Sequence, residues 1–94
     1  MDLYFEWDDA KNKRNQEIHG ISFELAAYVF EDEWHLVIYD EKHSTDEDRY
    51  IAIGLVNDVL FVVFTERQDK IRIISARMAT EQERRLYYDK DFRY

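Results

Sequence analysis

The alternation of apolar and polar positions predicts a series of short strands in the second two-thirds of the chain. Four segments, residues 34–39, 49–56, 59–67 and 71–76, are rich in β-branched and aromatic residues and are bounded by polar turns. Residues 3–7 form a further, shorter candidate strand near the start. The hydrophobic pattern therefore favours a sheet of four to five strands.

Two helices are expected between the first strand and the others. Asp8 is a suitable N-cap for a helix over residues 9–18, and Gly20 is a suitable C-terminal stop. This helix has almost no apolar stripe, so it is expected on the surface with few contacts or against a partner. Ser22 caps a second helix over residues 23–30, whose apolar residues follow helical spacing.

A third helix is expected near the C-terminal end. Thr80 and Glu83 have the spacing of a capping box, and the helix that they open reaches about Tyr88. Together these elements predict an α+β fold, with the two N-terminal helices packed on one face of an antiparallel sheet. No repeat, linker or low-complexity tract divides the sequence, so residues 1–94 are expected to form a single domain.

Composition narrows the class of protein. The 94 residues are 46% hydrophobic, which is enough for a packed core, so a disordered chain is not expected. The absence of cysteine removes disulfides and thiolate zinc sites. The sequence shows neither a signal-peptide pattern nor an apolar run of the roughly 20 residues that a membrane span needs. We therefore expect a soluble, cytoplasmic protein without membrane contact.

The charge balance restricts how nucleic acid could bind. The formal net charge is −8, whereas a protein that binds nucleic acid on its own is usually basic, because phosphate neutralisation supplies most non-specific affinity. Any contact with RNA or DNA must therefore be local. Acidic residues cluster at 31–33 and 40–48, in expected loops. Such clusters are usually solvated turns, and the alternative is a surface for a basic partner.

Two-residue turns at 57–58 and 68–69 would fix which side chains share a face of the sheet, because side chains alternate along each strand. One face, expected to pack on the helices, collects Ile51, Ile53, Leu55, Leu60, Val62, Phe64, Ile71 and Ile73. The opposite face collects Tyr50, Ala52, Gly54, Val59, Phe61, Val63, Thr65, Arg67, Arg72 and Ile74. In this register Arg72 lies across from Thr65, whereas a three-residue second turn would bring Arg77 beside Arg67.

The last hairpin concentrates three arginines, Arg67, Arg72 and Arg77, on or beside a strand in the middle of the protein. A guanidinium group is a planar, permanently charged fork that suits phosphate or carboxylate. The predicted face holds no obvious acidic neighbour for them, which favours an anion site. Ion pairs with Glu66 or with the acidic loops are the structural alternative.

Beyond these features, the sequence resembles the BrnT toxin family over nearly its whole length. The matching residues are Phe5-Glu6-Trp7-Asp8, Lys11, Asn15, His19-Gly20-Ile21-Ser22-Phe23, Ala26, Arg49-Tyr50, Gly54, Thr65-Glu66-Arg67, Ile71 to Arg77 and Glu83-Arg84. The resemblance implies a fold similar to RelE-type ribonuclease toxins, with helices on one face of the sheet and the other face open to RNA. It also implies a type II toxin that inhibits translation by cutting RNA.

The resemblance suggests residues for that chemistry. Cleavage by attack of a 2′-hydroxyl on the adjacent phosphate needs charge stabilisation and proton transfer, and it needs no metal or other cofactor because the nucleophile belongs to the substrate. The catalytic candidates are Arg67, Arg72, Arg77 and His19, and the RNA-binding candidates are Lys11, Tyr50, Thr65 and Lys70. His19 has a structural alternative, since a histidine beside Gly20 can satisfy carbonyls at a helix end.

The resemblance further implies a partner protein. This partner is a BrnA-like antitoxin with a ribbon-helix-helix DNA-binding part, which would form an operon-repressing heterotetramer and contact DNA on behalf of both chains. Two lysines of the family pattern are absent, since Ile18 and Met78 stand in their places. An alternative function is therefore a non-catalytic or degenerate toxin that acts mainly as an antitoxin-binding co-repressor.

Overall fold

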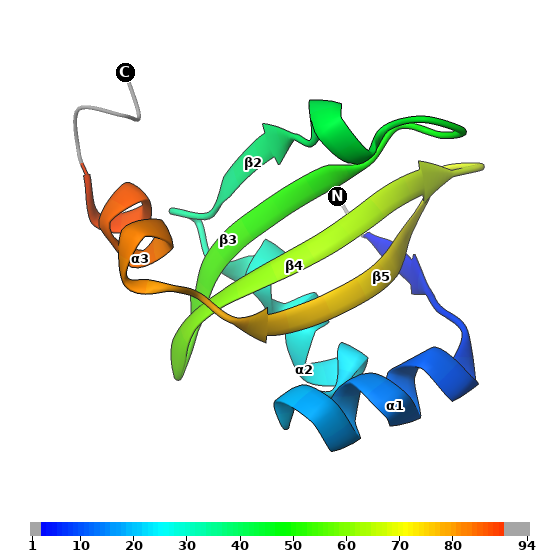
Figure 1. The fold of residues 1–94 in the computed structure, drawn as a ribbon, viewed down its shortest axis with the longest axis horizontal. Helices are drawn as coiled ribbons and strands as arrows, with labels where there is room; N and C mark the ends of the chain where they lie inside the picture. The colour runs from blue at the N-terminus through cyan, green and yellow to red at the C-terminus, as the bar shows by residue number, and fades with distance from the viewer. Residues whose placement is uncertain (1–2, 90–94) are drawn as a thin grey trace.

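A five-stranded sheet forms the centre of the structure, a computed structural model that describes residues 3–89 (Figure 1). The elements are β1 (Tyr4–Glu6), α1 (Asp9–His19), α2 (Phe23–Ala26), the 3-10 helix η1 (Ala27–Glu31), β2 (Leu36–Tyr39), the 3-10 helix η2 (Glu41–His43), β3 (Tyr50–Val56), β4 (Asp58–Arg67), β5 (Lys70–Met78) and α3 (Glu81–Tyr88). The predicted α+β class is confirmed.

The strands lie in the order β1-β5-β4-β3-β2, and the sheet is mixed. The four later strands pair antiparallel with their neighbours, as predicted, but β1 runs parallel to β5 through the pairs Tyr4↔Lys70, Phe5↔Ile71 and Glu6↔Arg72. The prediction of an antiparallel sheet was therefore wrong for β1. A parallel pair needs a long crossover, here the whole chain between β1 and β5, and no local turn signal announces it.

Helix α1 lies along β5, beyond the point where β1 stops. The Asn15 side chain is buried, and its amide nitrogen donates to the carbonyls of Ala76 (2.8 Å) and Ile21 (2.9 Å). Its amide oxygen accepts from the Ala76 N–H at 3.2 Å. Asn15 thus supplies the bonds that a neighbouring strand would give β5, which explains how a helix without an apolar stripe is held in place.

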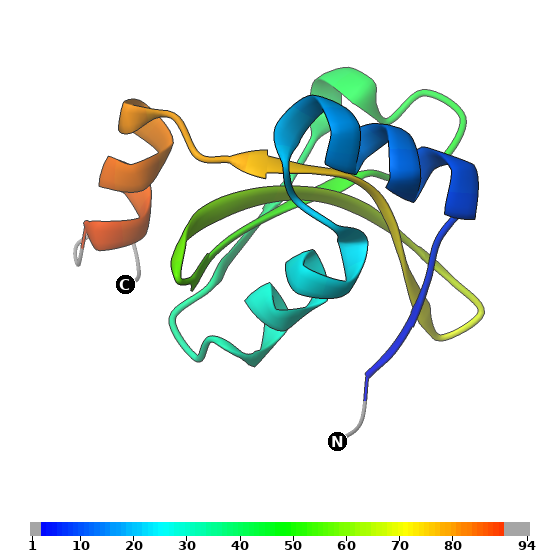
Figure 2. The same cartoon turned by 90° about the horizontal axis from the view of Figure 1, so that it is seen from below.

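The predicted helix over 23–30 is found, but it consists of two parts. The Ser22 hydroxyl accepts from the Leu25 N–H at 3.1 Å and begins α2, and after Ala26 the chain tightens into η1. Both parts contribute to the main core, which contains Ile21, Phe23, Ala26, Val29, Ala52, Leu60, Val62, Phe64, Ile73 and Ala76. Figure 2 shows α1 and α2 from below, well separated from α3.

We call the side of the sheet that contributes to this core the inner face, and the opposite side the outer face. On β3 the predicted faces were inverted. Asn57 alone makes the turn, with φ of 61°, and Val56 pairs with Asp58, so the register differs by one residue from a two-residue turn. Tyr50, Ala52 and Gly54 therefore lie on the inner face, and Ile51, Ile53 and Leu55 lie on the outer face.

Helix α3 covers part of the outer face. Thr80 and Glu83 form the predicted capping box, with the Glu83 N–H donating to the Thr80 hydroxyl and the Thr80 N–H donating to the Glu83 carboxylate. Tyr87 is buried against Ile53 and Val59 in a second, smaller core. The remaining length of the outer face leads from α3 to the turn between β4 and β5.

Candidate functional site

The hairpin of β4 and β5 was predicted correctly at its turn. Gln68 and Asp69 have φ of 49° and 69°, the conformation of a two-residue hairpin turn of the favoured hand. Thr65 pairs with Arg72, and Arg67 pairs with Lys70, as this turn requires. Arg67 and Arg72 are therefore diagonal neighbours on the outer face, where such side chains lie roughly 7–8 Å apart.

A bulge in β5 places the third arginine on the same face. Val63 pairs with Ser75 and Phe64 pairs with Ile73, so Ile74 is an extra residue without a partner in the register. In a regular strand, residues five apart point to opposite faces, but one extra residue restores the same direction. Arg72 and Arg77 thus share the outer face, roughly 15 Å apart along the strand.

Each of these arginines pairs with a carboxylate, so the expectation that their face holds no acidic neighbour was wrong. The bonds join Arg67 to Glu47 (2.8 and 3.0 Å), Arg72 to Glu6 (3.1 Å) and Arg77 to Glu83 (2.8 and 3.0 Å). Their side chains remain 53%, 27% and 34% exposed, in the same order. The alternative of ion pairs with an acidic loop holds for Arg67.

The partner of Arg67 comes from the loop between β2 and β3. Buried Thr65 donates its hydroxyl to the Asp48 carbonyl at 2.6 Å, and this bond holds the loop over the hairpin end of the outer face. The hydrogen bond from Arg67 is the main cause that lowers the pKa of Glu47. Glu6 adds to the field at Arg67, so two carboxylates and two guanidinium groups form one charge cluster.

Arg77 lies in a separate environment beside α3. Its guanidinium carbon is 3.9 Å from the centre of the Phe61 ring, a cation–π contact, and the same group binds both carboxylate oxygens of Glu83. The hydrogen bond from Arg77 lowers the pKa of Glu83 despite the opposing effect of burial. Arg77 therefore has a clear structural task, which is to connect β5 to the start of α3.

Two of the other predicted site residues, Thr65 and Lys70, lie beside the arginines, whereas His19, Lys11 and Tyr50 do not. His19 is exposed at the end of α1, and within residues 3–89 no hydrogen bond or ion pair links it to any of them. Lys11 is exposed on α1, while Lys70 is exposed beside Arg67 at the start of β5. Tyr50 lies on the inner face, stacked on Phe64 at 5.5 Å between ring centres.

Glu6 and Glu47 are the components that sequence reasoning missed. Glu6 meets Arg72 because β1 pairs with β5 across 66 positions of sequence. Glu47 had a weak signal in the sequence, since it belongs to the acidic loop before β3, and the start of β3 pairs with the part of β4 that ends at Arg67. Without the three-dimensional course of that loop, none of its acidic residues could be singled out.

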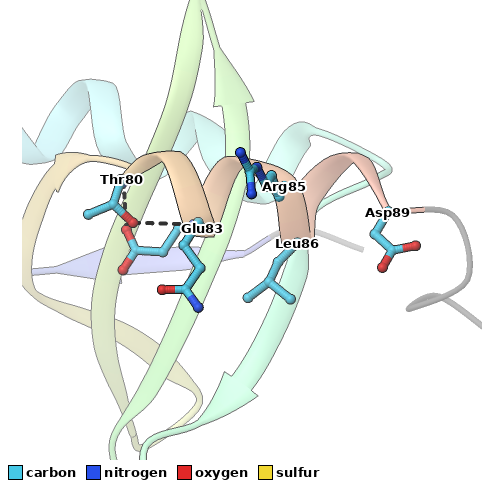
Figure 3. A pocket seen from close by; sticks show the side chains of 6 residues that line it. Thr80, Glu83, Arg85, Leu86 and Asp89 are labelled. Atoms are coloured by element: carbon cyan, nitrogen blue, oxygen red, sulfur yellow. Dashed lines mark hydrogen bonds between the residues drawn. The ribbon is translucent and has the colours of Figure 1, made fainter.

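A pocket of about 480 Å³ lies elsewhere, along α3 (Figure 3). It is lined by Thr80, Gln82, Glu83, Arg85, Leu86 and Asp89. None of the predicted site residues lines it, so it offers no support to the chemistry of the hairpin. Among residues 3–89, no three histidine, cysteine or acidic side chains gather to hold a metal ion. No helix in that range has the length and apolar content of a membrane span.

Comparisons with known proteins define the class. The crystal structure of the ribonuclease toxin BrnT from Brucella abortus is similar to this structure, with a TM-score of 0.66 and 24% sequence identity. The match covers 85% of this chain and 100% of that chain, and at this identity it shows the fold alone. No curated protein matches the sequence.

The sequence family gives the more specific result. The family described as "Ribonuclease toxin, BrnT, of type II toxin-antitoxin system" matches residues 7–83, which is most of the chain. The class is thus that of ribonuclease toxins of type II toxin-antitoxin systems. The protein belongs to the BrnT family, and the resemblance seen in its sequence is confirmed.

Proposed function

We propose that the protein is a RelE-like, metal-independent RNA endonuclease that inhibits translation and is neutralised by a BrnA-type antitoxin. The observation that carries this proposal is the placement of Arg67, Arg72 and Arg77 on one face of the sheet. Single-stranded RNA would lie along the outer face, with a phosphate at Arg67 and Arg72. Membership of a ribonuclease toxin family supports the reaction class.

In the proposed reaction, the ribose 2′-hydroxyl gives its proton to water and its oxygen attacks the adjacent phosphorus. The bond from phosphorus to the 5′-oxygen breaks, which leaves a 2′,3′-cyclic phosphate, and the 5′-oxygen takes up a proton from water. Negative charge builds on the phosphoryl oxygens, and paired guanidinium groups stabilise it. Arg67 and Arg72 are the residues in position to do so. Arg77 and Lys70 would contact flanking phosphates, one on each side of this pair.

The ion pairs of the free protein must open for RNA to bind. Exposed pairs between carboxylates and long cationic side chains are weak, because water and salt screen them. Arg67 is 53% exposed and its partner Glu47 comes from a loop, so a phosphate can replace that carboxylate without disturbing the sheet. The Glu47 carboxylate then acts as a competitor that lowers affinity for RNA.

Cleavage of a defined single-stranded RNA by the purified protein in EDTA tests the proposal. Arg72→Ala should reduce kcat/KM about 100-fold, the order of the loss of one charge-stabilising donor. Arg14→Ala is the matched control, because Arg14 carries the same charge and is exposed on α1. Equal cleavage by both variants, or no cleavage by the unmodified protein, would contradict the proposal.

The competitor role of Glu47 gives a separate prediction with the opposite sign. Glu47→Gln should bind the same RNA several-fold more tightly, because Arg67 is released while the fold of the loop is kept by Thr65 and Asp48. Glu41→Gln, in the same loop, should have little effect. Weaker binding by Glu47→Gln would show that the carboxylate supports the site instead of blocking it.

A non-catalytic co-repressor is the second candidate, and two observations favour it. All three arginines have internal carboxylate partners, and the two positions that lack the family's lysines, Ile18 and Met78, are 66% and 43% exposed. In this function the protein would hold a ribbon-helix-helix antitoxin in a heterotetramer and contact DNA only through it. Expression alone separates the candidates, since growth arrest relieved by Arg72→Ala requires the nuclease.

A further inference from the structure

Strand β2 forms one edge of the sheet, and among residues 3–89 no strand pairs with the edge of β2 that faces away from β3 (Figure 1). The Asp40 N–H donates to the Arg49 carbonyl at 2.8 Å, so the pair 40↔49 is a hydrogen-bonded one. Such pairs alternate with pairs that bond outward. In the register Val37↔Ala52 and Tyr39↔Tyr50, the backbone groups of Val37 and Tyr39 therefore point away from β3.

The side chains of this edge favour association with another chain. Val37 and Tyr39 are 51% and 48% exposed, and β2 itself contains neither proline nor a charged residue. Natural sheets usually protect an edge with such residues or cover it. On the other side of the sheet, the part of β5 that extends beyond β1 is covered in this way, because Asn15 of α1 bonds to the outward backbone groups of Ala76.

The surrounding charge selects the kind of chain that fits. Residues 31–48, which contain β2, hold eight acidic residues and one lysine, a formal charge of −7 out of −8 for the whole protein. The other basic groups in this segment are His35 and His43, and His43 is already paired with Asp40. This charge repels RNA and repels β2 of a second copy, and it attracts a cationic polypeptide.

We propose that the edge of β2 binds an extended, lysine- or arginine-rich segment of a partner protein, which adds to the sheet as a sixth strand. Main-chain bonds to Val37 and Tyr39 would provide affinity, and the acidic residues on either side would select a basic sequence. The identification of this partner as the antitoxin rests on the proposed function, whereas the binding chemistry of the edge does not.

Amide hydrogen exchange of the whole protein, followed by NMR, tests the site directly. The probe is an acetylated seven-residue peptide of alternating lysine and valine. On saturation, the amides of Val37 and Tyr39 should become protected, while Ile38, already bonded to β3, should change little. Protection elsewhere without protection of these two amides would overturn the proposal.

Matched variants separate the backbone from the charge contribution. Val37→Pro removes an outward N–H that β3 does not use, so the edge strand tolerates it, and it should weaken peptide binding at least tenfold. Val37→Thr keeps the N–H and should bind normally. If Val37→Pro unfolds, the pair of changes Glu41→Lys and Asp46→Lys should still weaken binding at least fivefold, with Glu17→Lys as the charge control.

The remaining outcomes are also decisive. A peptide with glutamate in place of lysine should bind at least tenfold more weakly, and equal binding would overturn the charge argument. Protection of Val37 and Tyr39 by self-association, detected as a doubled mass in light scattering, would assign the edge to a second copy and overturn the proposal. If the protein binds the peptide but does not cleave RNA, the proposed nuclease function is overturned and the proposed edge site stands. If it cleaves RNA but does not bind the peptide, only the edge site is overturned.

Discussion

Replacement of Asn15 by leucine should be one of the most destabilising single changes in this protein. The leucine has a similar volume but cannot bond, so it leaves three buried backbone groups without partners, namely the N–H and carbonyl of Ala76 and the carbonyl of Ile21. Each such group costs roughly 1–3 kcal/mol. Allowing for relaxation of α1, the expected loss is about 3–5 kcal/mol, a large part of the roughly 5–15 kcal/mol that stabilises a typical domain.

Urea unfolding followed by circular dichroism measures this loss, and thermal unfolding should show a fall in Tm of about 12–40 °C for a chain of this size. Gln16→Leu is the matched control, since Gln16 is the next residue, carries the same amide group and is exposed. Its free energy of unfolding should stay within about 0.5 kcal/mol of the original. A loss below about 1 kcal/mol for Asn15→Leu would refute the view that this amide holds α1 on β5.

Two further predictions concern the packing of η1 and the anchoring of α3. Gly54→Ala should lower the free energy of unfolding by about 1–3 kcal/mol, because the added Cβ would lie 2.7 Å from Val29 Cγ1 and 3.1 Å from the Val29 carbonyl oxygen. Urea unfolding measures this loss. The control is Gly20→Asn, because Gly20 lies in open space and asparagine tolerates its left-handed backbone; equal losses for the two variants would contradict the packing argument. The pKa of Glu83 is lowered, mainly by Arg77, so the contribution of this carboxylate to stability is complete above its ordinary pKa of 4.5 and is lost as the pH falls through the folded pKa. The difference in free energy of unfolding between the original protein and Glu83→Gln should therefore be constant near neutral pH and shrink below pH 4.5. A difference that persists in acid would exclude the ion pair as its cause.

The sequence predicted those parts of the fold that depend on neighbouring residues. Strand positions followed from apolar alternation, the capping box of α3 from the spacing of Thr80 and Glu83, and the pairing of Thr65 with Arg72 from the turn at 68–69. The prediction of which β3 side chains lie on which face was wrong because it depended on the length of the turn before β4, and the actual turn is one residue shorter. Asn57 tolerates a positive φ and closes the turn alone, which reverses every side chain of that strand.

The candidate site was predicted only in part, for a related reason. The arginines were evident as a group, but the carboxylate partners of Arg67 and Arg72 come from a loop and from β1, which are 20 and 66 positions away, and no local pattern encodes such separations. The RNA-binding role of Tyr50 depended on the wrong face of β3, and His19 had only its motif. The net charge of the whole chain was also a misleading guide to RNA binding, since nearly all of the net negative charge lies in residues 31–48.

The extra residue in β5 has a consequence for how this surface can vary among relatives. The side of the sheet on which Arg77 lies is set by how many residues separate it from Arg72, and the chemical identity of Ile74 matters little. Substitutions at this position should be tolerated, but a one-residue deletion would turn the guanidinium group toward the main core. A gap in an alignment here would therefore mark a protein with a different arrangement of cationic groups, even where every arginine is retained.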